Sequence, residues 1–345
     1  MNAIQLIEEG KKFTAKLELE NAEAKFNNAL TSDPGSIDAR IWLGKVALMK
    51  GQSDVASNFL KEALAIEPKD AEALALQGVC ELQQGNLEMA IHYLESARNL
   101  NSELDLIHSN LSRCYKLLGK FDEAEASARK ALEINPKNAE AHFELAACMT
   151  KKNKMSDALI HCVNAVNSNP FFVDAYIALG TMFVLAGKTD QAIAVYRKGL
   201  TNMPNAHILR DHLCTLLFKQ GNLQLAAEEA YVSVQRRNDY GDHLRLGIYA
   251  LAAGKFELAE KAFLKSTESN PESWEGHYNL GELSAAAELM EQSRTQYEMA
   301  IAKGKDEWKP FNGMGLWFLK FGKQYDQAKK NFTHAAKLQP GQPEP

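Results

Sequence analysis

Apolar residues recur along this chain at steps of three and four, the spacing of one face of an α-helix. Residues 105–138 show the pattern most completely, with a first apolar stripe at His108, Leu111, Tyr115 and Leu118. Gly119 ends this first helix, because glycine enters a left-handed turn without steric cost. A second helix follows, with Asp122 as its expected N-cap, and Pro136 bars its continuation. Two helices of about a dozen residues are marginal alone, so they predict neighbours of the same kind.

The same pattern recurs every 34 residues through the chain. The alanine of the second helix keeps this step at Ala22, Ala56, Ala90, Ala124, Ala158, Ala192 and Ala226. A helix–turn–helix unit of this length, with these alanines, turn glycines and closing prolines, resembles the tetratricopeptide repeat family. The resemblance covers essentially the whole chain. It implies an all-α fold, a right-handed superhelical solenoid of antiparallel helix pairs.

We expect a single array of about ten repeats over residues 1–340, followed by a disordered tail at 341–345. The expected repeats are 3–36, 37–70, 71–104, 105–138, 139–172, 173–206, 207–239, 240–273, 274–307 and 308–340. The first has Leu17 where a turn glycine is usual, and the tenth carries one extra residue between Gly322 and Ala328. The seventh repeat is one residue short. We therefore expect altered twist, with defects of stacking, near 236–240 and 302–308.

Composition and charge narrow the class of protein further. With 46% hydrophobic and 24% charged residues, the chain is expected to fold rather than to be disordered. The net charge is −5, and basic residues do not form a stripe interleaved with aromatics, so we expect no nucleic-acid partner. The N-terminal sequence lacks the pattern of a signal peptide, and no apolar run reaches the length of a membrane span. Together with five unpaired cysteines, this favours a cytoplasmic protein.

A second stripe of each first helix is the candidate binding surface. Positions two, five, nine and twelve of the helix lie roughly opposite the packing stripe, at about 100° per residue. The resemblance implies that they line a concave groove that holds partner peptides. The expected groove residues are Ile41, Lys45, Leu48, Val79, Ser109, Asn110, Arg113, Lys116, Phe143, Ile177, Thr181, Val184, Asp211, Thr215, Phe218 and Tyr278. At position five of the stripe, seven of the ten repeats carry an apolar residue. This favours an amphipathic helix or an extended apolar peptide, although part of this character should serve packing between repeats.

The fourth repeat interrupts this apolar stripe with polar and basic groove residues. These are Ser109, Asn110, Arg113 and Lys116, where we expect an acidic or carbonyl anchor of the partner. A second basic cluster spans the seventh repeat and comprises Arg210, Lys219, Arg236, Arg237 and Arg245. We expect a solvated face there, with contact to an acidic partner as the alternative.

The chain shows no sequence motif of catalysis, so we expect no enzyme, no cofactor and no metal site. Cys80, Cys114 and Cys148 recur at one position of successive repeats. Equivalent points on packed helices lie about 8–10 Å apart, whereas a zinc ion needs its sulfur ligands about 2.3 Å away. We expect the cysteines to be small buried hydrophobes, and the repeated histidines, such as His108 and His142, to be packing residues.

These observations predict a non-catalytic scaffold that binds a helical or extended peptide segment of a partner protein in its groove. One alternative is a homo-oligomer joined end to end, since residues 1–104 carry a net charge of −6 and residues 308–345 one of +4. Another alternative is a regulatory or targeting subunit of an enzyme encoded elsewhere.

Overall fold

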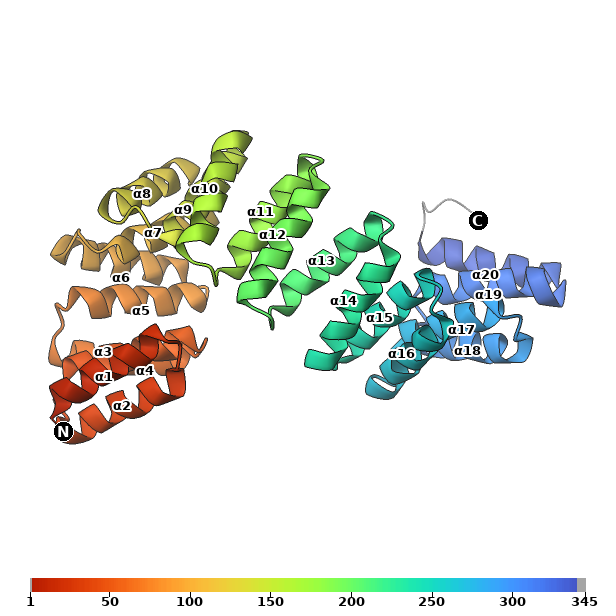
Figure 1. Ribbon diagram of the computed structural model, residues 1–345, viewed down its shortest axis with the longest axis horizontal. Helices are drawn as coiled ribbons and strands as arrows, with labels where there is room; N and C mark the ends of the chain where they lie inside the picture. Colours follow the sequence, from red (N-terminus) through yellow and green to blue (C-terminus); the bar gives the residue numbers. More distant parts are fainter. Residues whose placement is uncertain (1, 340–345) are drawn as a thin grey trace. The chain divides into compact units, whose positions relative to one another are not determined.

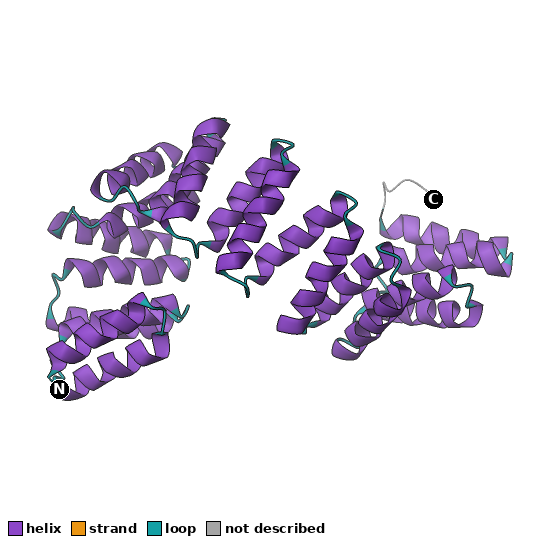
Figure 2. Ribbon diagram, viewed as in Figure 1, coloured by secondary structure: helices purple, strands orange, loops and turns teal. Residues whose placement is uncertain are grey.

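The computed structural model describes residues 2–339, and over this range it contains α-helices and no strand (Figures 1 and 2). The expected all-α fold is confirmed. The chain forms two compact units, Met1–Leu179 and Gly180–Pro345, whose boundary falls within helix α11 (Val173–Leu185). The twenty α-helices within residues 2–339 fit about ten repeats, while the repeat boundaries themselves stay a prediction. The expected tail at 341–345 lies outside the described residues.

The helices of the first unit alternate between 13 and 14 residues, and the two members of each pair pack against one another. They are α1 (Ala3–Ala15), α2 (Leu19–Ser32), α3 (Ile37–Met49), α4 (Ser53–Ile66), α5 (Ala71–Gln83), α6 (Leu87–Leu100), α7 (Asp105–Leu117), α8 (Phe121–Ile134), α9 (Ala139–Lys151) and α10 (Met155–Ser168). Each second helix also contacts the first helix of the next pair, so the core continues from one pair to the next.

The second unit continues the same order of helices. After α11 come α12 (Thr189–Asn202), α13 (His207–Lys219), α14 (Leu223–Arg236), α15 (Tyr240–Ala252), α16 (Phe256–Ser269), α17 (Trp274–Ala286), α18 (Met290–Lys303), α19 (Trp308–Trp317), the π-helical turn η1 (Phe318–Gly322) and α20 (Tyr325–Leu338). The extra residue of the tenth repeat lies in this π-helical turn and not between Gly322 and Ala328 as expected, because a π turn accommodates one more residue than an α turn.

The turn inside each helix pair places one residue in the left-handed region. Glycines such as Gly119, with φ +75°, occupy this place in six turns. Where glycine is missing, a residue with a side chain adopts the same conformation, as Leu17 does with φ 61° and Glu288 with φ 59°. A β-carbon in this region costs about 1–2 kcal/mol. The backbone of the array therefore dictates the turn, and these two residues bear strain.

Replacing either strained residue by glycine is expected to stabilise the protein. Leu17→Gly and Glu288→Gly should each raise the free energy of unfolding by about 0.5–1 kcal/mol, since relief of strain exceeds the entropic cost of glycine. Urea denaturation followed by circular dichroism measures the change. Gly119→Ala is the matched control and should lower stability by about 1 kcal/mol. Equal or lower stability of both glycine variants would contradict the strain.

The expected N-cap of the fourth repeat is wrong. Helix α8 begins at Phe121, so Asp122 lies in its first turn, and Lys120 takes the N-cap position. The carboxylate of Asp122 instead forms an ion pair with Lys152 at 2.6 Å. Lys50 makes the equivalent contact with Glu20 at 3.3 Å. These acids tie a second helix to the end of the next first helix, a role that a single-repeat analysis does not show.

A size-matched contact between the two helices of a pair recurs through both units. Position eight of the first helix is glycine where position 24 of the repeat is large, or position 25 in the tenth repeat with its extra residue. A β-carbon on these glycines would come within 3 Å of the large side chain in seven pairs: Gly10 and Phe26, Gly44 and Leu60, Gly78 and Leu94, Gly180 and Tyr196, Gly247 and Phe263, Gly281 and Tyr297, and Gly315 and Phe332. In the other three repeats both positions hold small, buried residues: Ser112 and Ala128, Ala146 and Cys162, and Cys214 and Ala230.

The two irregular boundaries remain packed. Helix α14 contacts α15 across residues 236–240, and α18 contacts α19 across residues 302–308. Gly304, between α18 and α19, lies so close to Trp274 that a β-carbon would come within 2.7 Å of the ring. Both boundaries are therefore packed, while the stacking defects and the altered twist expected near them stay predictions.

Candidate peptide-binding groove

In the first unit, several of the expected groove residues serve packing between repeats. Ile41 is 2% exposed and packs with Ala73 and Leu76 of the next repeat. Ser109 is 3% exposed, and its hydroxyl donates to the carbonyl oxygen of Leu106 at 3.1 Å. Leu48 and Val79 are only partly exposed. Little of this apolar stripe is accessible to a partner.

The two expected lysines of the first unit are engaged within the chain. Lys45 pairs with Glu72 at 2.6 Å and lies 4.1 Å from the centre of the Trp42 ring. Lys116 pairs with Glu144, which is almost fully buried, also at 2.6 Å. Burial raises the pKa of the Glu144 carboxyl, although Lys116 opposes this effect. Both lysines thus join neighbouring repeats.

Most of the polar residues expected to anchor a partner in the fourth repeat are already engaged in contacts within the chain. Besides Ser109 and Lys116, Asn110 is also engaged, since its amide donates to the carbonyl oxygen of Leu106 at 2.8 Å. Arg113 alone is exposed and makes no hydrogen bond or ion pair with the described residues. Of the two remaining expected residues of this unit, Phe143 packs on Phe172, with ring centres 5.0 Å apart, and Ile177 is partly buried.

The second unit, in contrast, contains an open cleft on the expected surface. The cleft has a volume of about 440 Å³ and is formed by α11 and α13, with one residue of α12. Its lining consists of Thr181, Val184, Tyr196, Ile208, Asp211, His212, Thr215, Leu216 and Lys219. Four of these are expected groove residues: Thr181, Val184, Asp211 and Thr215. The structure therefore brings together residues that the sequence places 34 residues apart.

The expected groove did not include the other five residues that line the cleft. Ile208 occupies position two of its helix, so the same stripe would have identified it, and Lys219 was assigned to the basic cluster. His212 and Leu216 flank the stripe on α13. Tyr196 belongs to a second helix, and its ring stacks on His212 with centres 5.7 Å apart. A stripe drawn on first helices alone cannot include it.

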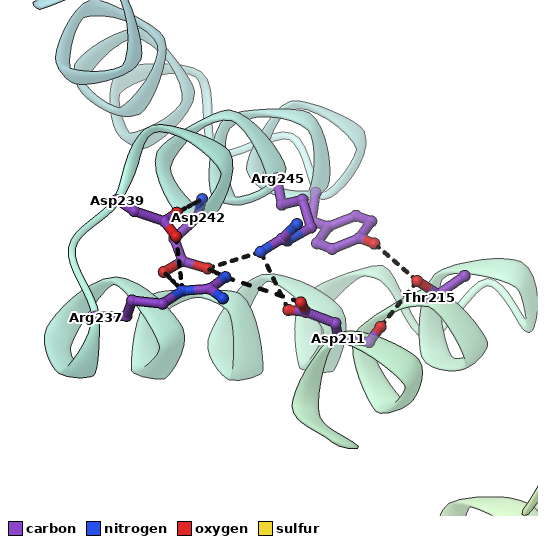
Figure 3. A network of polar contacts seen from close by, with 7 residues as sticks. Asp211, Thr215, Arg237, Asp239, Asp242 and Arg245 are labelled. Carbon is purple, nitrogen blue, oxygen red and sulfur yellow. Dashed lines mark hydrogen bonds and ion pairs between the residues drawn. The ribbon is translucent and has the colours of Figure 1, made fainter. Parts of the chain in front are cut away.

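A network of charges holds the wall of the cleft in place (Figure 3). Asp211 lies 3.2 Å from Arg245 and 3.8 Å from Arg237. Both arginines also contact the buried carboxylate of Asp242, at 2.8 Å and 2.5 Å respectively. Arg237 further pairs with Asp239 at 2.8 Å. The network closes the short boundary between α14 and α15 and fixes the side chain of Asp211 at the cleft.

The polar network also reaches the next first helix. Thr215 donates to the carbonyl oxygen of Asp211 at 2.8 Å and lies 3.4 Å from the hydroxyl of Tyr249 (Figure 3). Phe218 packs on Tyr249, with ring centres 5.1 Å apart. Tyr278 lies apart from the cleft, between the rings of Trp274 and Tyr297.

The basic cluster of the seventh repeat is only partly the solvated face that was expected, because Lys219, Arg236 and Arg237 are exposed whereas Arg210 is not. Contact with an acidic partner stays a prediction. Arg210 is buried and pairs with Glu229 at 2.6 Å. Arg236 donates to the side-chain oxygen of Asn205, and Arg237 and Arg245 are occupied by the aspartates described above. Of this cluster only Lys219 is exposed without a partner among the described residues.

The cysteines and histidines take the packing roles that were expected. All five cysteines are buried, and burial raises the pKa of the Cys80 thiol to about 12 and that of Cys114 to about 11. His108 Nε2 lies 2.9 Å from the carbonyl oxygen of Ser102, and His142 Nε2 lies 3.1 Å from that of Pro136. Each of these histidines thus contacts, and stabilises, the loop that precedes its own helix.

Family models described as tetratricopeptide repeat match residues 14–80 and 118–179 in one case and 244–307 in another, together more than half of the chain. The chain belongs to the tetratricopeptide repeat family. Proteins built from these repeats are generally non-catalytic scaffolds of protein interactions, and this fold is consistent with that role. Within the described residues of this repeat protein, no helix has both the length and the apolar character needed to cross a membrane.

Solved structures with a similar fold include other tetratricopeptide repeat proteins. A thermophilic TPR protein of Thermus thermophilus is 23% identical, covers 53% of this chain and 99% of its own, and has a TM-score of 0.46. PilF of Pseudomonas aeruginosa is 19% identical, covers 61% of this chain and 96% of its own, and has a TM-score of 0.47. PilW, a type IV pilus biogenesis factor, is 19% identical, covers 61% of this chain and 98% of its own, and has a TM-score of 0.49. No curated protein matches the sequence.

Proposed function

We propose that this repeat protein is a non-catalytic scaffold that binds a peptide segment of a partner protein in the cleft between α11 and α13. The accessible cleft of about 440 Å³ on the expected groove surface is the observation that carries the proposal. Val184 is 40% exposed and Ile208 is 57% exposed, so apolar area is available for burial against a partner. The fixed charge network supplies polar contacts without reorganisation on binding.

The first unit contributes less to this proposed site. Several of its stripe residues are buried, as Ile41 is, or joined in ion pairs, as Lys45 and Lys116 are. A partner that displaced those lysines would leave Glu72 or the buried Glu144 without its ion pair, at a cost in free energy. We therefore place binding in the second unit.

The alternative of end-to-end assembly is less well supported by the first helix. Gln5 and Lys12 of α1 are exposed, whereas the same two positions are buried in all later first helices. These two polar side chains reduce the apolar area of the first helix that a second copy could cover, to which Ile4, at 72% exposed, still contributes. A regulatory or targeting role for an enzyme encoded elsewhere is compatible with the proposed cleft, because the bound segment could belong to such an enzyme.

Charged substitutions in the cleft should weaken peptide binding. A phage-displayed library of 12-residue random peptides, selected on the full chain, supplies the probes. We expect enriched peptides to lose at least about tenfold in affinity for Val184→Asp and Ile208→Asp, because a buried unpaired carboxylate costs more than about 1.4 kcal/mol. Isothermal titration with synthetic peptides measures the affinities.

Met299→Asp is the matched control for these variants. Met299 is 42% exposed, similar to Val184, but it lies on α18 away from the cleft. Circular dichroism should show intact helices in all three variants. Enriched peptides that bind the cleft variants as tightly as the control would overturn the proposed site.

A further inference from the structure

The polar residues of the cleft follow one side of α13 with an ordered change of charge. Asp211, Thr215 and Lys219 are spaced by four residues, so they lie on the same side of the helix, and all three line the cleft. An acid therefore lies toward the beginning of the helix, a hydroxyl in the middle and a cation at its end. The cleft thus has, at one end, an ammonium that is unpaired among the described residues and, at the other, a carboxylate that two arginines contact.

Both charged ends are open to a further partner. Lys219 is exposed and has no hydrogen bond or ion pair with the described residues. Asp211 is 29% exposed, and its contacts with Arg245 and Arg237, at 3.2 Å and 3.8 Å, leave acceptor sites unused. Burial raises the pKa of Asp211 despite these arginines, so its anionic form gains from another donor.

Apolar side chains line the cleft between and around these charges. Val184 and Leu216 provide apolar walls from α11 and α13, and Ile208 extends the apolar lining near Asp211. The cleft volume of about 440 Å³ is large enough for a bulky side chain. The distance along the helix from Asp211 to Lys219 is about 12 Å, from eight residues at about 1.5 Å each.

We propose that the cleft recognises an extended, bipolar segment, in which a bulky apolar residue stands two residues from a base on one side and two residues from an acid on the other. The base faces Asp211 and the acid faces Lys219. In an extended strand, residues i, i+2 and i+4 point to one face and span about 13 Å, which matches the separation of the two charges. This inference rests on the proposed function and adds the chemistry and register of the partner.

Peptide selection on two proteins of opposite charge tests the register. The library of 12-residue peptides is selected in parallel on the unaltered chain and on Lys219→Glu. Peptides enriched on the unaltered chain should carry the base–x–apolar–x–acid pattern, in either chain direction, more often than the unselected library. Selection on Lys219→Glu should replace the acid by a base. Lys261→Glu, an exposed lysine on α16, is the control and should leave the pattern unchanged.

A synthetic peptide then isolates the contact with the lysine. Changing the acid of an enriched peptide to its amide should weaken binding to the unaltered chain about fivefold, as expected for an exposed ion pair. The same change should have no effect on binding to Lys219→Gln. Enriched peptides with neutral flanks that still require Val184 would overturn the bipolar segment and leave the proposed function intact. Selections without any peptide that requires Val184 would overturn both.

Discussion

Phe263→Ala is expected to lower the free energy of unfolding by about 3–5 kcal/mol, because the substitution leaves a cavity in the core of the second unit. The ring of Phe263 is 0% exposed. It lies directly over Gly247 of α15, where a β-carbon would come within 2.3 Å of the ring. Urea denaturation followed by circular dichroism measures the loss. Phe256→Ala, which truncates a ring that is 58% exposed, should cost much less.

The companion substitution tests whether the two positions are matched in size. Gly247→Ala alone should cost about 1–3 kcal/mol, since the new methyl group forces the ring from its place. In the double variant the methyl group enters the space that the ring has left, so the combined loss should fall short of the sum of the two single losses. The natural pair of Cys214 and Ala230 shows that two small residues suit this contact. Additive losses would contradict the matching.

Arg237→Met is expected to lower the free energy of unfolding by about 2–3 kcal/mol. The carboxylate of Asp242 is 0% exposed and receives two hydrogen bonds from Arg237, at 2.5 Å and 2.8 Å. Removal of one partner of a buried ion pair typically costs about 3–5 kcal/mol. The expected value is lower because Arg245 still contacts Asp242 at 2.8 Å. Arg236→Met, one residue earlier on the surface, should have little effect.

The dependence of stability on pH tests the contact between Arg237 and Asp242 from the side of the carboxylate. Burial of Asp242 would raise its pKa, but the hydrogen bonds from Arg237 and Arg245 outweigh burial and hold the pKa below the ordinary value of 3.8. A carboxyl with a lowered pKa in the folded state stabilises the protein above its unfolded pKa. This contribution is lost as the pH falls through the lower folded pKa. Between pH 6 and about pH 3, Asp242→Asn should therefore lose less stability than the unaltered chain. An equal loss would contradict the lowered pKa.

The periodic part of the fold could be predicted from the sequence because the same pattern of apolar, turn and closing residues recurs in each repeat. The turn after the first helix is an example, since Gly119 identifies the left-handed residue and Leu17 adopts the same conformation in its own repeat. Contacts that join repeats are different in kind. Asp122 has the residue type of an N-cap, and only the position of Lys152 on the next repeat gives its carboxylate another role.

The candidate site illustrates the same limit. Position five holds Ile41 in one repeat and Asp211 in another, and the stripe alone assigns both to the groove. Whether such a side chain is accessible depends on the bulk of its neighbours, so Ile41 is buried while Asp211 lines a cleft. The arginine network could not be foreseen either, because Asp211 and Arg237 are far apart in sequence and the charge pattern does not pair them.

The size-matched contact has a consequence for how such an array can change over generations. Gly247 and Phe263 belong to the same repeat, and so do the members of every other pair. A gene duplication or recombination event that inserts or removes a whole 34-residue unit therefore carries both partners along. Lineages can lengthen, shorten or shuffle the array without breaking these contacts. A crossover between helices that joined the first helix with Cys214 to the second helix with Phe263 would instead place a bulky ring against a residue that leaves it no room.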